Sequence, residues 1–303
     1  MLAQRTLTAW RGACGCRRGE LRMGRDHRMT VLPITVVVPV KNEAANLPEC
    51  LAALENFFQV VVVDSASIDA TVDIAHAAGA TVVDFKWSGG FPKKRNWVLQ
   101  NFQFNTEWIL FLDADEKPTP AFKSAVAAAI GKTGYVGFWL HYRNHFMGRV
   151  LNYGVRQRKL ALFRIGSGFY ERIDNPGWSA LDMEVHEHPV LDGPVGEIYE
   201  PLEHKDFRGL RHFIDRHNEY SSWEANRYIA LVGNPLAWGH LTGRQKIKYS
   251  NLRRWWYAPS YFILTYVLKR GFLDGRPGFI YAMSKYIYFF QVREKILEAE
   301  AGI

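Results

Sequence analysis

The feature that most constrains the fold is a regular alternation of apolar blocks with helical segments through the first half of the chain. The first block, Leu32–Val40, reads LPITVVVPV. It is rich in β-branched residues and lacks polar alternation, which is typical of a strand buried on both faces of a parallel sheet. The next segment predicts a helix, because four apolar side chains recur there at helical spacing: Leu47, Leu51, Leu54 and Phe58.

This alternation repeats. A second strand, QVVVVD, ends at Asp64, and Ser67 is the expected N-cap of a helix near residues 69–78. A third strand (ATVVDF), a third helix (FPKKRNWVLQNF) and a fourth strand (WILFLDAD) follow. Strands and helices that alternate at this spacing form βαβ units with right-handed crossovers. We therefore predict an α/β fold with a doubly wound parallel sheet.

Much of the formal charge of +8 lies in one segment. Residues 1–29 carry seven arginines against one glutamate and one aspartate, and they show no helical or strand periodicity. We expect a disordered basic arm there. Two of the three cysteines, Cys14 and Cys16, lie in this arm, so a disulfide framework is not expected. The third, Cys50, is expected to be a small core residue.

Polar residues gather where the predicted strands end. In doubly wound sheets the ligand lies outside the carboxyl ends of the strands, so these residues are candidates for a binding site. The first two strands supply Pro39, Asn42, Glu43, Asp64, Ser65 and Ser67, and the fourth supplies Asp113 and Asp115.

The residue types indicate what this edge binds. The turn after the first strand has no glycine, and the chain has no Gly-x-x-x-x-Gly-Lys loop, which argues against a dinucleotide fold and a P-loop. The Asp113-Ala114-Asp115 carboxylates suit hard Mg²⁺ or Mn²⁺, which completes its coordination with phosphate oxygens and water. Lys93, Lys94 and Arg95 follow a Gly-Gly pair and could meet a phosphate. A divalent metal that bridges protein and diphosphate fits this set.

Four segments in order, VVVPVKNEAANL, VVVVDSASIDATVDIA, KKRNWVL and ILFLDADE, resemble the signatures of inverting family 2 glycosyltransferases of the GT-A fold. The resemblance implies transfer of a sugar from a nucleotide diphosphate donor, most often UDP. It implies a GT-A catalytic domain over residues 30–207, with a nucleotide-binding half at 30–132 and a mixed acceptor half at 133–207. C-terminal helices would follow over 208–303.

Residue roles also follow from the resemblance. Pro39, Glu43, Asp64 and Ser65 would form the nucleotide pocket, with Asp64 accepting a hydrogen bond from the base. Asp115 would be the firmer metal ligand, and Asp113 would lie near the ribose and the metal. Arg95 and Lys94 would face the diphosphate, and His204 could complete the metal or diphosphate site.

Inversion requires a general base that takes the proton of the acceptor hydroxyl. We look for it in SALDMEVHEHPV of the acceptor half. If this is a strand, Glu184 and His186 share one face and Glu187 lies on the other. The resemblance favours Glu187, with His186 or Glu184 as the alternatives.

The segment MEVHEHPVLDGPVGEIYEPLEHKDF resembles the lipopolysaccharide core β-1,4-glucosyltransferase subgroup. This implies glucose as the sugar and a lipopolysaccharide core, or another glycan or lipid-linked molecule, as the acceptor. Aromatic rings can stack on sugars, and three in the acceptor half are candidates: Trp139, Tyr142 and Trp178.

The C-terminal region mixes tryptophan, tyrosine, arginine and lysine with apolar blocks. Its longest block without charge, Trp255 to Leu268, is shorter than the ~20 residues of a spanning helix. Aromatic and basic residues around short apolar blocks are typical of an interfacial helix. We expect a cytoplasmic protein on the inner face of the plasma membrane. The alternative is a helical cap packed on the sheet.

Two other functions remain open from the sequence. Haloacid dehalogenase-like phosphatases also use Asp-x-Asp with magnesium, but there the pair ends the first strand. The basic sequence pI of about 9.3 suggests a nucleic-acid binder, yet no nucleic-acid motif is present and the excess charge lies largely in the arm.

Overall fold

The sheet is organised around β1 (Leu32–Val40), which is buried along almost its whole length. It pairs in parallel with β2 (Phe57–Asp64) on one side and β4 (Trp108–Phe111) on the other. The computed structural model describes residues 31–173, 177–178, 182–183, 188–205, 207–239 and 241–302. The predicted basic arm lies outside these residues.

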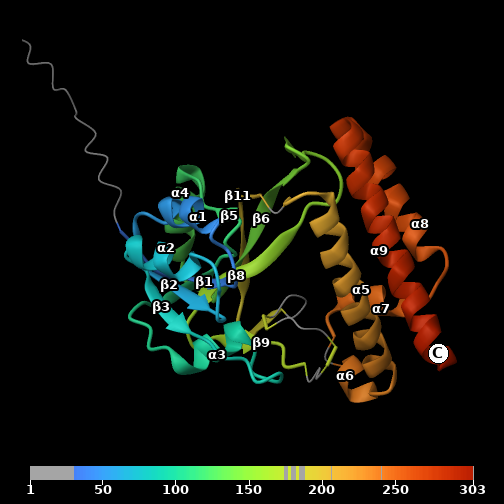
Figure 1. Ribbon diagram of the computed structural model, residues 1–303, viewed down its shortest axis with the longest axis horizontal. Coiled ribbons are helices and arrows are strands. Elements are labelled where there is room, and N and C mark those ends of the chain that lie inside the picture. Colours follow the sequence, from blue (N-terminus) through green and yellow to red (C-terminus); the bar gives the residue numbers. More distant parts are fainter. Residues whose placement is uncertain are drawn as a thin grey trace, which may run out of the picture. The chain divides into compact units, whose positions relative to one another are not determined.

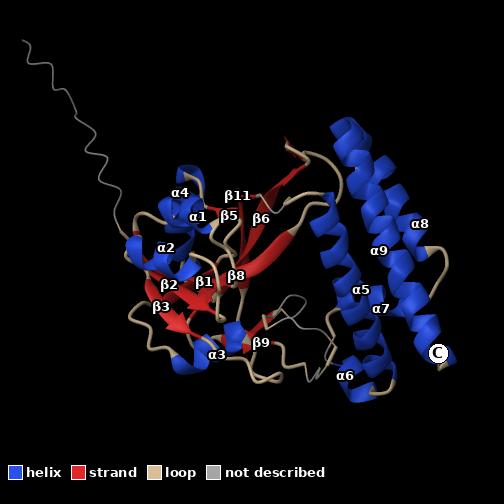
Figure 2. Ribbon diagram, in the orientation of Figure 1, coloured by secondary structure: helices blue, strands red, loops and turns tan. Residues whose placement is uncertain are grey.

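Within the described residues, the main sheet has nine strands in the order β3-β2-β1-β4-β8-β6-β11-β5, with β7 paired to β6. Figure 2 draws the strands in red. The first four are parallel. The next ones form a mixed extension, because β8 is antiparallel to both β4 and β6, whereas β11 is parallel to β6. The remaining bounds are β3 (Thr81–Asp84), β5 (Glu116–Lys117), β6 (Gly137–Phe146), β7 (Arg149–Val150), β8 (Arg158–Arg164) and β11 (Val195–His204); β9 (Gly168–Tyr170) and β10 (Pro189–Leu191) form a separate pair.

Four helices belong to the predicted α/β alternation: α1 (Leu47–Ala53), α2 (Thr71–Ala77), α3 (Lys94–Asn101) and α4 (Pro120–Ile130). The core between helices and sheet includes Val36, Val38, Leu110 and Phe122, all fully buried. Cys50 is buried in this core, as predicted. A parallel half followed by a mixed extension is the predicted GT-A architecture, and the fold prediction is confirmed.

Two local predictions are wrong. Phe58 does not continue the first helix, which ends at Ala53; it lies in β2 and is largely exposed. The neighbouring Phe57 pairs with Leu32, and this sheet pairing outweighs the helical spacing. Ser67 does not cap α2, which begins at Thr71 without a side-chain cap. Its hydroxyl donates to the Asp64 carboxylate instead.

The C-terminal region consists of helices: α5 (Leu210–Val232), α6 (Pro235–Gly239), α7 (Gly243–Asn251), α8 (Tyr257–Phe262), the π-helix η1 (Ile263–Leu268), the 3-10 helix η2 (Gly271–Asp274) and α9 (Gly275–Ala301). Figure 1 shows α5 and α9 running side by side. Their core includes Tyr288, Phe289 and Val292. Phe146 at the end of β6 contacts rings on both long helices, and residues Val31–Ile303 cluster as one unit.

No helix in the described part of the chain is both long enough and apolar enough to cross a membrane.

Candidate active site

The loops after β1 and β2 are tied together by hydrogen bonds. Asn42 has a positive φ of 56°. Its N–H donates to Ser67 Oγ at 2.8 Å, and its side-chain oxygen accepts the N–H of Ile68 at 2.9 Å. Asp64 is buried and accepts both the N–H and the hydroxyl of Ser67. These bonds fix the Asp64 carboxylate at the end of β2, where the sequence predicts it.

Ser65 follows Asp64, and its side chain is buried. Its hydroxyl oxygen has no hydrogen-bond partner among the residues that the structure describes. A buried hydroxyl without a partner costs free energy, and a ligand that binds at this edge would remove that cost.

Glu43 lies at the same edge and is held from several sides. Its N–H donates to Thr71 Oγ1 at 2.8 Å, and its carboxylate accepts from Asn46 at 2.9 Å. Arg208, just before α5, forms an ion pair with the same carboxylate. The sequence gives no signal for this pair, because the two residues are 165 positions apart.

Asp113 follows β4 and is paired with two cations. Arg95 donates to Oδ1 at 2.6 Å, and Lys159 Nζ on β8 lies 3.5 Å from Oδ2. Burial alone would raise the pKa of Asp113, but Lys159 and Arg95 lower it well below its usual range. Asp113 therefore stays charged.

Glu116 is fully buried next to this pair. Lys159 Nζ lies 2.6 Å from Oε1 and 2.5 Å from Oε2, and the Tyr142 hydroxyl donates to Oε1. Burial raises the pKa of Glu116 to about 7, although Lys159 opposes this shift. Sequence reasoning missed Lys159 and Glu116. The one available signal was for Lys159, a charged residue directly before the apolar segment LALF.

The three aromatic candidates for sugar stacking are all engaged with protein. The Tyr142 ring stacks on His204 with centroids 4.8 Å apart. Arg158 lies over Trp139 at 4.6 Å, and Trp178 meets Trp223 edge to face. Their sugar-binding role stays a prediction.

Asp115 and His204 meet on the other side of Glu116. His204 Nε2 lies 3.7 Å from Asp115 Oδ1. The other ring nitrogen, Nδ1, lies 2.9 Å from the side-chain oxygen of Asn144. An amide oxygen only accepts hydrogen bonds, so Nδ1 donates to Asn144, and Nε2 is the ring nitrogen that faces Asp115. Ligand atoms of Asp115, Glu116 and His204 lie within 4.8 Å of one another.

Lys94 is buried and points away from solvent. Its ammonium group donates to the Val40 carbonyl at 2.8 Å and lies 3.4 Å from the Asp182 carboxylate. Burial lowers the pKa of Lys94, and Asp182 opposes this. In this arrangement Lys94 links the end of β1 to the segment around Asp182. Its predicted contact with a diphosphate stays a prediction.

Pro39 lies inside β1, paired with Val63 of β2. The candidate bases Glu184, His186 and Glu187 lie outside the described residues, so the structure does not test them.

Acidic side chains at the ends of parallel strands, interleaved with buried cations, are typical of an α/β enzyme that handles a charged ligand. The model of the family described as "Glycosyl transferase family 2" matches residues 35–187. The chain belongs to this family, and it is a glycosyltransferase.

Two curated glycosyltransferases are similar to this chain along most of their own length. The chain is 25% identical over 285 residues to the lipopolysaccharide core biosynthesis glycosyltransferase LpsC of Rhizobium meliloti (strain 1021), covering 89% of this chain and 94% of that protein. It is also 25% identical over 293 residues to an uncharacterized glycosyltransferase of Rickettsia felis, covering 88% and 92%.

Among solved structures, it is similar to glucosyl-3-phosphoglycerate synthase from Mycobacterium tuberculosis in complex with Mn²⁺, UDP-glucose and phosphoglyceric acid. That match has 25% identity and a TM-score of 0.31, and it covers 36% of this chain and 43% of that chain.

Proposed function

We propose that this enzyme transfers a hexose, glucose, from UDP-glucose to a lipopolysaccharide core or another lipid-linked glycan, with inversion at the sugar carbon. The similarity to LpsC along nearly the whole chain supports the acceptor class. The observation that carries the proposal is the Asp115–His204 pair beside the ion-paired Asp113 at the end of β4.

The donor set suits a divalent metal. A carboxylate oxygen and an imidazole nitrogen are ligands that Mn²⁺ accepts, and Mg²⁺ accepts the carboxylate. Asp115 and His204 would hold the ion. Glu116 is a weaker candidate because Lys159 and Tyr142 already occupy its oxygens. When bound, the ion stabilises the negative charge of the diphosphate.

The protein's own cations would act on the same charge. Arg95 and Lys159 neutralise Asp113, so this carboxylate can lie beside the ribose without repelling the diphosphate strongly. Asp64 would accept a hydrogen bond from the base, and the Ser65 hydroxyl would join the pocket with Pro39 and Glu43.

The chemical step we propose is a direct displacement. The base, Glu187 or otherwise His186 or Glu184, takes the proton of the acceptor hydroxyl while its oxygen attacks the anomeric carbon. The bond from that carbon to the diphosphate oxygen breaks, and the electron pair leaves with UDP. Attack from the face opposite the leaving group inverts the configuration.

Family membership favours this function over the two alternatives. In a haloacid dehalogenase-like phosphatase the aspartate pair would end the first strand, whereas here Asp113 and Asp115 follow β4. A nucleic-acid function has no support from the family or its relatives. A lipid-linked acceptor also suits an enzyme at the cytoplasmic face of the plasma membrane, and we include this location in the proposal.

Calorimetric titration with UDP, GDP and dTDP, each with and without Mn²⁺, tests the proposal. We expect UDP to bind more tightly than GDP and dTDP, and we expect UDP to reach its full affinity only in the presence of Mn²⁺. If folded protein binds none of the three nucleotides, the proposed donor is wrong. If GDP or dTDP binds more tightly than UDP, that nucleotide replaces UDP as the donor class, and the proposed transferase function stands.

The orientation of His204 gives a second prediction. Replacing Asn144 with alanine removes the acceptor that holds Nδ1–H, and we expect Mn²⁺ affinity to fall about 10- to 100-fold. Free Mn²⁺, measured by electron paramagnetic resonance in the presence of UDP, reports this affinity. Asn101→Ala on α3 is the matched control, because its side-chain amide donates to the Trp97 carbonyl of the same helix. An unchanged Mn²⁺ affinity in Asn144→Ala would remove His204 from the metal site.

A further inference from the structure

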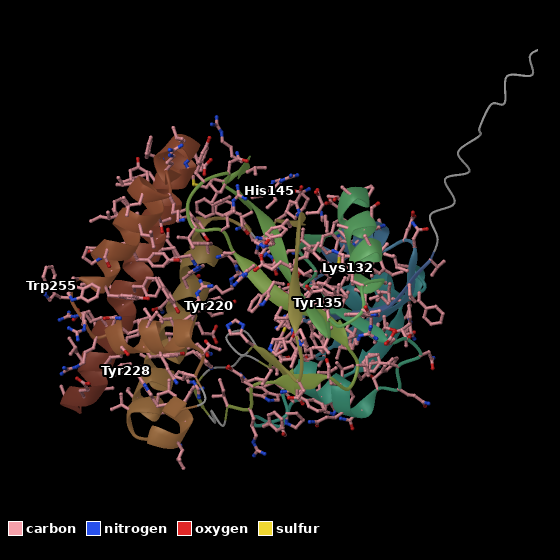
Figure 3. The ribbon with its side chains drawn as sticks, turned by 180° about the vertical axis from the view of Figure 1, so that it is seen from behind. Lys132, Tyr135, His145, Tyr220, Tyr228 and Trp255 are labelled. Carbon is pink, nitrogen blue, oxygen red and sulfur yellow. The ribbon has the colours of Figure 1, made fainter. Side chains whose placement is uncertain are left out.

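The C-terminal helices expose an unusual number of large apolar side chains. We define the aromatic-basic face as the exposed residues of the α7–α8 connection, η1, η2 and the start of α9. Its apolar members are Trp255, Trp256, Ile263, Val267, Leu268, Phe272, Leu273 and Phe279. Trp255 is 74% exposed and Leu268 is 67% exposed. In Figure 3, Trp255 projects from the margin of the helical part.

Ring contacts join four elements of this region. Tyr266 of η1 lies 5.3 Å from Phe262 of α8, 6.2 Å from Phe272 of η2 and 5.6 Å from Phe279 of α9, measured between ring centroids. The exposed apolar side chains of η1, η2 and the start of α9 therefore belong to elements that share one packed aromatic cluster. Exposed apolar patches of this kind mark interaction sites.

The charge of this face is mainly positive. Residues 251–293 contain seven basic residues and a single acidic one, Asp274. The Asp274 carboxylate accepts the N–H groups of Asn152 at 3.1 Å and Tyr153 at 3.0 Å. Arg254, Lys269 and Arg276 are exposed, and within the described residues they form no ion pair with a carboxylate within 4 Å. The face is therefore positive.

The face is also attached firmly to the sheet. The Asp274 bonds and a bond from Gly154 N–H to the Lys269 carbonyl at 2.9 Å join it to the loop between β7 and β8. Lys159, which holds Asp113 and Glu116, lies on β8 directly after this loop. These hydrogen bonds link the face to the loop that leads directly into β8, the strand that carries Lys159.

We propose that the aromatic-basic face binds the surface of an anionic phospholipid bilayer. Tryptophan and phenylalanine with flanking arginine and lysine are the composition of interfacial elements, in which apolar side chains enter the headgroup boundary and cations meet anionic lipid. A second copy of this chain would bring two positive faces together, which their charge opposes. The proposed function places the enzyme at the cytoplasmic face of the plasma membrane, and this inference identifies the surface of the protein that binds there. It rests on the proposed function for that location alone.

Vesicle flotation of the full chain tests the proposal, with phosphatidylcholine vesicles and with vesicles that also contain phosphatidylglycerol. We expect flotation with the anionic vesicles and little with phosphatidylcholine alone. In a first variant, Trp255→Ser, Leu268→Ser and Leu273→Ser are combined, and we expect at least a tenfold loss of binding. A second variant combines Arg254→Ser, Lys269→Ser and Arg276→Ser. Its binding should fall roughly a hundredfold and lose its preference for anionic lipid.

A control variant combines Val31→Ser, Phe58→Ser and Tyr199→Ser, whose native side chains are 60%, 54% and 75% exposed outside this face. It should float like the native chain. All three variants should keep native UDP binding in calorimetry, so vesicle binding and the proposed function can fail separately. Equal flotation of the first variant and the native chain would overturn the proposal. The proposal would also be overturned if no form of the protein binds vesicles and light scattering shows a native dimer that the first variant has lost.

Discussion

Replacing Asp115 with asparagine is expected to abolish the Mn²⁺-dependent part of UDP binding. The amide removes the negative charge that faces His204 Nε2 at 3.7 Å, and a neutral amide oxygen binds a hard cation more weakly than a carboxylate does. The UDP dissociation constant of the variant in Mn²⁺ should equal that of the native protein without metal. Metal ions contribute several kcal/mol to such reactions, so the transfer rate should fall by roughly a thousandfold.

Calorimetry with UDP and Mn²⁺, and UDP release in an acceptor assay, measure the two effects of Asp115→Asn. Asp84→Asn is the matched control, because Asp84 ends β3 of the same sheet and its side chain is exposed. Circular dichroism should show both variants folded. If Asp115→Asn keeps Mn²⁺-dependent binding at native strength, Asp115 is not the metal ligand, and Glu116 with His204 becomes the next pair to test.

The parallel half of the fold is predictable from local pattern. A β-branched apolar run such as Leu32–Val40 predicts a strand that is buried on both faces of a parallel sheet. Its place in the interior of the fold therefore follows from composition alone. The polar residues after β1, β2 and β4 then fall at one edge because parallel strands share their carboxyl ends. For this reason Glu43, Asp64 and Asp113 could be placed at one edge of the sheet before the structure was known.

The mixed extension is not predictable in the same way. The strand order β4-β8-β6-β11-β5 is not the order of the chain. It brings Lys159 to Glu116 across 43 positions, and His204 to Asn144 across 60. No spacing rule anticipates contacts that depend on which strands become neighbours. Lys159 and Glu116 were therefore missed, whereas His204 was predicted as a site residue only by family resemblance.

Local signals failed where tertiary pairing competed with them. The helical spacing of Phe58 lost to the pairing of Phe57 with Leu32 at the start of β2. Ser67 has the right chemistry for an N-cap, but Asp64 lies three residues before it and accepts its hydroxyl. In both cases a contact with another residue outweighs the local signal: strand pairing in the first case, and a side-chain hydrogen bond in the second.

The second large effect is expected from Lys159→Met. Glu116 is fully buried, and both of its oxygens depend on Lys159. Without Lys159 the buried Glu116 carboxyl loses its counter-charge and must take up a proton, and removing one partner of a buried pair typically costs about 3–5 kcal/mol. We expect the free energy of unfolding, measured by urea denaturation, to fall by about that amount. Asp113 also loses a partner but keeps Arg95 at 2.6 Å, so it should contribute less.

A second substitution separates lost charge compensation from lost packing. In Lys159→Met with Glu116→Gln, no buried charge remains at Glu116, and the Tyr142 hydroxyl can still donate to the amide oxygen. Replacing both partners of a buried pair by neutral groups is often close to neutral in stability. The double variant should therefore recover most of the loss. If it is as unstable as Lys159→Met alone, packing around the lysine stem is responsible for the loss, and the Lys159–Glu116 ion pair contributes little to the stability of the fold.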